Sequence, residues 1–345
     1  MPATIKEVAE RAGVNPSTVS RVINEDPKLS IREETRNRIL QAIEELQYRP
    51  NAVARSLRLK TTGTVGMIIP DITNPFFPEI IKGAESAASE RELSLILCNT
   101  DENPEKERSY IELLTEKQVD GILLASAYIQ DETVDLVTKR KIPYVLVNRT
   151  ARNAVGASVR VDDVLGAQLA IQHLVALGHR RIAHISGLLY TETGLDRLEG
   201  YRRTLNQCQI PFLSEYMVEA RFSERDGYLA MERLLALPDP PTGVFAANDL
   251  IALGAMSAIR DHGWSVPEDI SVVGFNDTWL AEKVHPPLTS VKVPLYDMGY
   301  LAVESLARKI LGETMPQDKI VLKPELMIRR STDAATARTR VIREA

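Results

Sequence analysis

The chain has 345 residues, of which 44% are hydrophobic, and it carries 42 basic against 47 acidic side chains. This length predicts two or three domains, each with a core of its own. No stretch approaches the roughly 18 consecutive apolar residues that a membrane helix needs, and the N-terminus lacks a secretory apolar segment, so we expect a cytoplasmic protein without membrane contact. The two cysteines, Cys98 and Cys208, predict neither a disulfide framework nor a metal site.

Charge differs between the front of the chain and the rest. Residues 1–60 hold 11 basic and 8 acidic side chains, a net charge of +3, whereas the remainder has a net charge of −8. Residues 49–60 contain four cations and no acid. Such a segment attracts polyanions, although charge alone favours an ordinary solvated linker.

The first sixty residues have the patterns of three short helices. Apolar spacing predicts a first helix that ends at Gly13, and Asn15 followed by Pro16 predicts the start of a second. Ser30 and Glu33 match a capping box and predict the start of a third helix. Two short helices joined by a glycine turn, the second with a polar outer face, are typical of a helix-turn-helix that enters the DNA major groove. Ordinary helical hairpins have the same spacing, so the pattern alone leaves both possibilities open.

Three stretches of sequence carry a more specific signal. Residues 4–9 (TIKEVA) and 12–24 (AGVNPSTVSRVIN) closely resemble the headpiece of the lac/gal repressor family of bacterial transcription regulators. Residues 48–57 (YRPNAVARSL) resemble the hinge helix of that family, which orders on operator DNA and pushes a leucine into the minor groove. The resemblance extends over nearly the whole chain and implies a DNA-binding regulator whose core is similar to the periplasmic sugar-binding proteins.

The resemblance also implies which side chains contact DNA. In the second helix, Ser17 and Arg21 would read bases, while Thr18, Ser20 and Asn24 would contact phosphates. In the hinge, the implied contacts are Asn51, Ala54 and Leu57. A leucine wedge unstacks one base step at a cost of roughly a few kcal/mol, which the contacts of the bent duplex must offset; alternatively, Leu57 packs at a domain junction. Pro16 departs from the family pattern because it offers only apolar contact, so the preferred operator sequence is not implied.

Beyond the hinge, strand-like apolar runs alternate with helical stretches, and the alternation occurs twice. The first series has strands at 65–69, 95–98, 122–125 and 144–147, with helices at 75–90 and 104–117. The second series has strands at 182–185, 217–220, 244–246 and 271–275, with helices at 164–177, 196–206, 224–237 and 249–261. We therefore expect an α/β fold with two lobes, each a doubly wound parallel sheet, after a small all-α headpiece.

The patterns and the resemblance together predict the domain limits. They are a helix-turn-helix headpiece at 1–49, a hinge helix and linker at 50–61, an effector-binding core at 62–333 and a flexible tail at 334–345. In the family the chain crosses between the lobes three times, which here implies crossovers near 162, 291 and 322. The N-lobe would then span about 62–162 and 294–322, and the C-lobe about 163–291 and 323–333. The tail lacks leucine heptads, which favours a homodimer over a tetramer.

Polar and aromatic side chains follow the ends of several predicted strands. Open parallel sheets bind ligands beyond the carboxyl ends of their strands, so these side chains are candidates for one site between the lobes. Each also coincides with a ligand contact in the sugar-binding relatives; they are Asn74, Phe76, Phe77, Asn148, Arg149, Arg197, Phe222, Asn248 and Asn276. An asparagine at one such position can simply cap a helix, as we expect for Asn74, but recurrence at the ends of six strands favours a binding site.

Departures from the sequences of the pentose-binding relatives narrow the range of effectors that we expect. Those relatives usually have acids where this sequence has Asn148 and Asn276. With fewer opposing carboxylates, Arg149 and Arg197 could hold a carboxylate by bidentate contacts. We therefore expect a small polyhydroxy effector and favour a sugar acid over a neutral sugar. Neutralisation of either arginine would weaken this preference, and the candidate acids are Asp71, Asp249 and Asp277.

No catalytic constellation is present in the sequence. It contains no Gly-rich phosphate loop, no G-x-S-x-G elbow and no H-E-x-x-H motif, so we expect neither enzyme activity nor a cofactor. The resemblance instead implies a homodimeric repressor that binds palindromic double-stranded operator DNA under allosteric control by the effector. Two alternatives remain. One is a regulator of the same fold that a protein partner controls, and the other is a sugar-binding transport component, which should carry an export signal and no headpiece.

Overall fold

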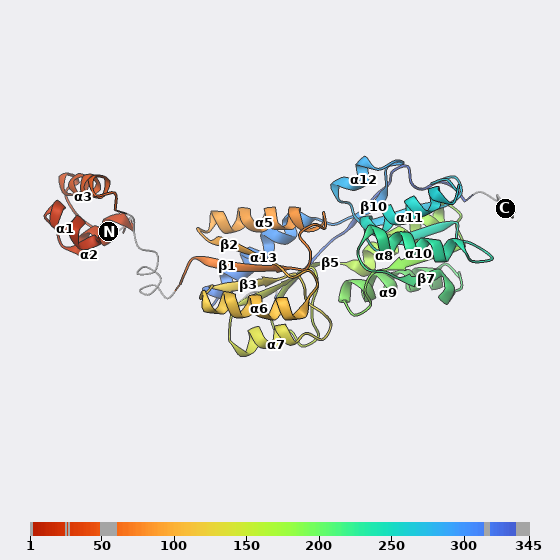
Figure 1. The fold of residues 1–345 in the computed structure, drawn as a ribbon, viewed down its shortest axis with the longest axis horizontal. Helices are drawn as coiled ribbons and strands as arrows, with labels where there is room; N and C mark the ends of the chain where they lie inside the picture. Colours follow the sequence, from red (N-terminus) through yellow and green to blue (C-terminus); the bar gives the residue numbers. More distant parts are fainter. Residues whose placement is uncertain (1–2, 25, 27, 49–60, 314–317, 336–345) are drawn as a thin grey trace. The chain divides into compact units, whose positions relative to one another are not determined.

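The computed structural model describes residues 3–24, 26, 28–48, 61–313 and 318–335. The chain divides into two compact units, with the boundary between Thr62 and Gly63 (Figure 1). The predicted hinge contacts Asn51, Ala54 and Leu57 lie outside the described residues. No helix in the described part of the chain is long and apolar enough to cross a membrane.

The first unit is a small headpiece of helices. These are α1 (Ile5–Ala12), α2 (Pro16–Ile23) and α3 (Glu33–Glu45). Gly13 ends α1 in the left-handed region with φ 65°, and the Asn15 side chain accepts a hydrogen bond from the Ser17 amide at the start of α2, as the sequence predicts. The fully buried side chains where the helices meet include Val8, Val19 and Ile39.

One predicted feature of the headpiece is wrong. The helix α3 begins at Glu33 with Arg32 before it, so Ser30 is too far from the first turn to cap it. No side chain of the described residues caps the first amides of α3. Glu33 and Glu34 place negative charge in the first turn, where it interacts favourably with the helix dipole. The first turn is therefore stabilised by charge and not by a capping box.

The N-lobe of the second unit is built on a six-stranded parallel sheet in the order β11-β5-β4-β3-β1-β2. Its strands are β1 (Thr64–Ile69), β2 (Ser94–Asn99), β3 (Gly121–Leu124), β4 (Tyr144–Val147), β5 (Ala157–Val161) and β11 (Lys319–Leu322). Its helices are α5 (Phe77–Glu90), α6 (Pro104–Glu116), α7 (Glu132–Lys139) and α13 (Leu295–Ile310). Figure 1 shows α5 and α13 on one face of this sheet and α6 and α7 on the other, so both faces are buried.

The C-lobe has a second six-stranded sheet in the order β12-β10-β9-β8-β6-β7, parallel except for the edge strand β12. Its strands are β6 (Ile182–Ser186), β7 (Met217–Glu219), β8 (Gly243–Ala246), β9 (Ser271–Asn276), β10 (Thr289–Lys292) and β12 (Glu325–Met327). Its helices are α8 (Asp163–Ala176), α9 (Glu192–Gln207), α10 (Glu224–Leu235), α11 (Asp249–Asp261) and α12 (Trp279–Lys283), with a short 3-10 helix at Ser214–Tyr216. Helices α8 and α9 cover one face, and α10 and α11 cover the other.

The two-lobed α/β fold expected from the sequence is confirmed, with differences at its edges. The chain passes from one sheet to the other after β5, after β10 and after β11. The strands β5, β10, β11 and β12 were not predicted, because they are short and two of them are partly exposed edge strands with weak apolar patterns. Helix α9 begins at Glu192 instead of 196, and α5 begins at Phe77 instead of 75.

Candidate functional site

A cavity of about 450 Å³ lies between the two lobes, beyond the carboxyl ends of their strands. Because both sheets direct these ends toward the same space, residues far apart in the sequence meet there. The structure brings all nine candidate effector-binding residues to the cavity wall: Asn74, Phe76, Phe77, Asn148, Arg149, Arg197, Phe222, Asn248 and Asn276. Lining residues that the sequence analysis did not single out include Thr193, Arg221, Ser223 and Asp226, which lie in loops or first helical turns without a distinctive motif.

The aromatic part of the wall comes from both lobes. The rings of Phe76 and Phe77 lie edge to face with centroids 5.0 Å apart, and both side chains are buried. Phe222 lies in the loop after β7, which ends at Glu219, and so does not end the strand. Asn74 is not the N-cap of α5, because its Oδ1 atom accepts a hydrogen bond at 3.1 Å from the Phe76 amide in the turn before the helix. This turn fixes the two rings at the cavity wall.

Several buried polar atoms at the cavity lack a partner within the protein. Among the described residues, four buried side-chain atoms have no hydrogen-bond partner: Asn148 Oδ1, Arg149 Nη1, His184 Nε2 and Asn276 Oδ1. All except the histidine belong to residues that line the cavity. An unpaired buried polar atom costs about 1–3 kcal/mol, so three around one cavity are an arrangement that a bound ligand would stabilise.

The backbone carries strain at two of these positions. Asn148 has φ 65° and Asn276 has φ 104°, a region that residues other than glycine rarely adopt. Strain of this kind costs about 1–3 kcal/mol and concentrates at ligand sites, where the surrounding structure holds it. The fold therefore directs both carboxamides at the cost of an unfavourable backbone conformation.

Arg197 is neutralised inside the protein. Its Nε atom donates a hydrogen bond at 2.7 Å to Asp163 Oδ1, and both side chains are almost fully buried. The guanidinium lies 3.8 Å from the centroid of the Phe275 ring, and its Nη1 atom donates to the carbonyl of Ala247. The expectation that Asp71, Asp249 or Asp277 would neutralise an arginine of the cavity is wrong, because the paired carboxylate is Asp163 at the first residue of α8.

Arg149 has a different environment. Its one ion-pair partner among the described residues is Glu102, with a nitrogen-to-oxygen distance of 3.8 Å. Its guanidinium lies 5.6 Å from the centroid of the Phe222 ring. Burial lowers the pKa of Arg149, and the carboxylate of Glu102 is the main charge that opposes this effect. Arg149 is therefore a buried cation with a free donor at the cavity.

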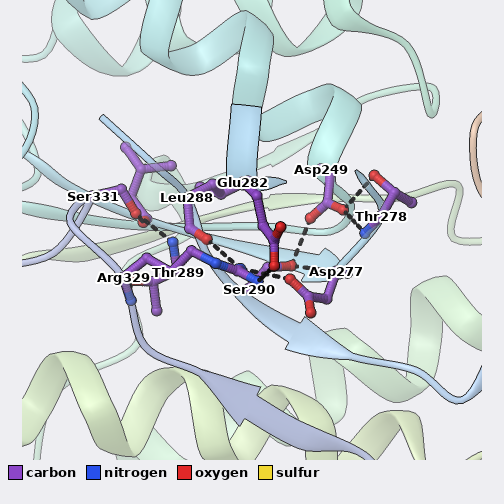
Figure 2. A network of polar contacts seen from close by, with 10 residues as sticks. Asp249, Asp277, Thr278, Glu282, Leu288, Thr289, Ser290, Arg329 and Ser331 are labelled. Atoms are coloured by element: carbon purple, nitrogen blue, oxygen red, sulfur yellow. Dashed lines mark hydrogen bonds and ion pairs between the residues drawn. The ribbon is translucent and has the colours of Figure 1, made fainter. Parts of the chain in front are cut away.

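A polar network holds the loop that follows Asn276, the last residue of β9 (Figure 2). Asp249 Oδ1 accepts a hydrogen bond from Ser290 Oγ at 2.6 Å, and Asp249 Oδ2 accepts from the Thr278 amide at 2.7 Å and from Thr278 Oγ1 at 2.9 Å. Burial raises the pKa of Asp249 to about 6, although these donors oppose the rise. The network joins the loop after β9 to α11 and β10.

A second part of this network reaches the end of the last crossover. Arg329 Nη1 donates hydrogen bonds to Asp277 Oδ1 at 2.6 Å and to the carbonyl of Leu288 at 2.8 Å (Figure 2). Arg329 follows β12, the strand that the chain enters after leaving the N-lobe at β11. Asn248, by contrast, has the local role that its sequence suggests, since its Oδ1 atom caps α11 by accepting from the Ile251 amide at 2.8 Å.

The candidate DNA-reading side chains lie on α2 of the headpiece. Ser17, Arg21 and Asn24 are exposed, and Thr18 and Ser20 are half-buried. Arg21 Nε donates to Asp26 Oδ2 at 2.8 Å, which is a contact that the sequence analysis missed because Asp26 follows the helix. The Asn24 side chain donates back to the carbonyl of Ser20. A polar, exposed face on the second of two short helices is the arrangement that helix-turn-helix proteins present to the major groove.

Comparison with known proteins identifies both units. Residues 4–51 match the family described as bacterial regulatory proteins, lacI family, and residues 171–332 match the periplasmic binding protein-like domain. The HTH-type transcriptional regulator RegA of Clostridium saccharobutylicum is 38% identical over 333 residues, which cover 96% of this chain and 100% of RegA. This chain is a member of the lacI family of bacterial regulatory proteins. The family expected from the headpiece and hinge motifs is thereby confirmed.

Solved structures support the assignment of this lacI-family chain. The lac repressor dimer bound to operator and the anti-inducer ONPF has a TM-score of 0.86 and 29% identity, and the match covers 97% of this chain and 100% of that one. The transcriptional regulator CelR in complex with cellobiose has a TM-score of 0.74 and 34% identity, and the match covers 95% of this chain and 99% of that one. The lacI-family chain is thus a ligand-responsive transcriptional regulator with a DNA-binding headpiece and a periplasmic-binding-protein-like core.

Proposed function

We propose that this lacI-family regulator is a homodimeric repressor that binds a palindromic operator and responds to a small sugar or sugar acid between its lobes. The observation that carries the effector part is the group of three unpartnered buried atoms around one cavity, at Asn148, Arg149 and Asn276. The solved lac repressor dimer on operator supports the DNA part, and CelR with cellobiose supports a saccharide in the core. The proposal includes a headpiece that ends at residue 49 and a core that spans 62–333.

The unpartnered atoms define the chemistry of the ligand. Amide oxygens accept hydrogen bonds, whereas a guanidinium nitrogen only donates them. A ligand that satisfies these atoms must therefore donate hydrogen bonds to Asn148 and Asn276 and accept one from Arg149. A polyhydroxy compound does both, and its apolar ring face suits the aromatic side chains Phe76 and Phe77. We therefore assign a sugar-like ligand to the cavity.

The preference for a sugar acid rests on one arginine. Asp163 already neutralises Arg197, so Arg197 has little charge to offer a ligand carboxylate. Arg149 keeps a free donor and has only the more distant Glu102 as a counter-charge among the described residues. A carboxylate on the ligand would form a charge-assisted hydrogen bond with Arg149, which is stronger than a neutral one.

Contacts from both lobes allow the ligand to act on DNA binding. Asn148 and Arg149 follow β4 of the N-lobe, whereas Asn276 ends β9 of the C-lobe. A ligand that bridges them favours one arrangement of the lobes, and such a difference in affinity is what shifts a conformational equilibrium. The coupling between effector and DNA is typically about 1–3 kcal/mol and must be equal in both directions.

On the DNA side, the proposal assigns roles to the residues of the second headpiece helix and of the hinge. Ser17 and Arg21 contact bases, and Thr18, Ser20 and Asn24 contact phosphates. The hinge contacts are Asn51, Ala54 and Leu57. Because Asp26 holds the Arg21 guanidinium, base contact by Arg21 requires either release of this ion pair or docking of the pair together.

The test measures operator and effector binding in one titration. The full-length protein selects a palindrome from a random duplex library, and fluorescence anisotropy gives the Kd of that palindrome with each member of a panel of neutral sugars and sugar acids. We expect one panel member to change this Kd by roughly 5- to 150-fold, and Arg149→Ala to remove most of the change. Phe212→Ala is the control variant, because Phe212 is a partly exposed side chain that does not line the cavity and does not belong to the headpiece.

Two outcomes would contradict the proposal. Equal affinity for the selected palindrome and for random DNA would show that the protein has no preferred operator. A response that requires a purified protein partner, and that Arg149→Ala leaves unchanged, would instead favour a regulator of this fold that a protein controls.

A further inference from the structure

A second cavity, of about 540 Å³, opens beside the first. Glu102 lines both cavities, so the two spaces share a wall. The second cavity has an aromatic part formed by Tyr128 and Tyr190 and a polar part that includes Gln130. Each of the two volumes lies in the range of roughly 300–1,000 Å³ that is typical of small-molecule sites, so one ligand ring in the first cavity would leave the second unfilled.

The two tyrosines come from different lobes. Tyr128 lies in the N-lobe loop between β3 and α7, and Tyr190 lies in the C-lobe loop between β6 and α9. Their ring centroids are 5.5 Å apart with the ring planes at 49°, and residue Tyr190 is 49% exposed. The Ile129 amide donates a hydrogen bond to the Tyr190 carbonyl at 3.2 Å, and Asp131 Oδ2 accepts one from the Tyr128 amide at 2.9 Å. One hydrogen bond between backbones and one from a backbone amide to a side chain therefore hold the loops that carry the tyrosine pair.

Electrostatic effects connect this pair to the main cavity. Burial raises the pKa of both tyrosines, that of Tyr128 to about 12; the charge of Glu102 adds to the rise, and the charge of Arg149 opposes it. Both hydroxyls are thus neutral near pH 7 and able to donate hydrogen bonds. Glu102 lines both cavities and is the ion-pair partner of Arg149, so a ligand that extends from one cavity to the other would pass Glu102.

We infer that the Tyr128–Tyr190 cavity is a second sugar subsite, which takes the second ring of a disaccharide or longer glycoside whose first ring lies in the main cavity. This inference rests on the proposed function. The apolar face of a pyranose fits against a tyrosine ring, and the hydroxyls of that sugar can bond to the edges of the cavity at Glu102 and Gln130. Because one tyrosine belongs to each lobe, a second ring bridges the lobes and increases the difference in affinity between lobe arrangements.

The test compares matched monosaccharides and disaccharides on the full-length protein by isothermal titration calorimetry. The pairs are glucose and cellobiose, xylose and xylobiose, and galacturonic acid and digalacturonic acid. We expect at least one disaccharide to bind about tenfold or more tightly than its monosaccharide. We expect Tyr190→Ala to remove most of this advantage while the matching monosaccharide keeps its affinity within about twofold.

Two further variants separate the ring from other effects. Tyr190→Phe keeps the aromatic ring and should retain most of the advantage of the disaccharide. Phe212→Ala removes a partly exposed aromatic side chain outside both cavities and should change neither affinity. Thermal unfolding of each variant tests whether the fold is intact.

The outcomes distinguish the subsite from the proposed function. The subsite is overturned if no disaccharide binds more tightly than its monosaccharide, or if Tyr190→Ala weakens the binding of both ligands equally. In either case, a monosaccharide that changes operator affinity would still support the proposed function. If no probe binds and no panel sugar changes operator affinity, both are overturned.

Discussion

Buried Glu107 makes the stability of the N-lobe depend on pH. Glu107 lies in the first turn of α6 with 2% exposure, and its Oε1 atom accepts hydrogen bonds from Ser126 Oγ at 2.6 Å and from Thr133 Oγ1 at 3.2 Å. Burial raises the pKa of Glu107 from 4.5 to about 7, the nearby Asp131 adds to the rise, and the two donors oppose it. The folded protein therefore holds this proton more tightly than the unfolded chain.

The size and sign of the effect follow from the two pKa values. The difference between 4.5 and about 7 corresponds to about 3 kcal/mol, at roughly 1.4 kcal/mol for each pKa unit. Because the folded state binds more protons between these pH values, its stability falls as the pH rises through this window. The contribution is fully present below pH 4.5 and is lost above about pH 7.

The variant Glu107→Gln removes this titration while it keeps the size of the side chain. Urea titrations of the full-length protein at pH 5 and pH 8 give the free energy of unfolding for both proteins. We expect the difference between variant and wild type to shift in favour of the variant by about 2 kcal/mol at the higher pH. Glu112→Gln, on an exposed position of the same helix, is the control and should show no such shift. Equal differences at the two pH values for Glu107→Gln would refute the reasoning.

Three further variants test other contacts. Asp163→Ala leaves the Arg197 guanidinium buried and unpaired, so the free energy of unfolding in urea should fall by about 3–5 kcal/mol. The double variant with Arg197→Met should recover much of this loss. Additive effects of the two substitutions would contradict a direct ion pair. Gly299→Ala places a methyl carbon 1.9 Å from a backbone oxygen of α5 and should lower the free energy of unfolding by about 1–3 kcal/mol. An unchanged Tm would contradict the close approach of α13 to α5. Asp26→Ala frees Arg21 and removes a negative charge beside the candidate DNA-reading helix, so the protein should bind nonspecific DNA severalfold more tightly at low salt. Weaker binding of nonspecific DNA would count against DNA contact by Arg21.

Local spacing accounts for how much of the fold could be predicted. Gly13 and Asn15 specify the turn between α1 and α2 because a left-handed residue and an N-cap act on their immediate neighbours. The apolar runs of the central strands are equally local. The short strands β11 and β12 escaped prediction because they are partly exposed at the sheet edges, where burial imposes no clear pattern.

The candidate site divides in the same way. Position after a strand end was enough to place Asn148 and Asn276 at a common cleft, because parallel sheets gather such ends at one edge. The effector role of these residues stays a prediction. The sequence could not show that Asp163, which lies 34 residues before Arg197, would neutralise the charge of Arg197.

Short-range hydrogen bonding, capping and side-chain periodicity determined the helices, the central strands and the loops with candidate residues, because each depends only on nearby neighbours along the chain. Tertiary structure alone decided which arginine kept a free donor and which two tyrosines came to share a second cavity. Ion pairing and cavity shape depend on distances between segments that the fold brings together, and those distances are set by how the lobes pack and not by separation along the sequence.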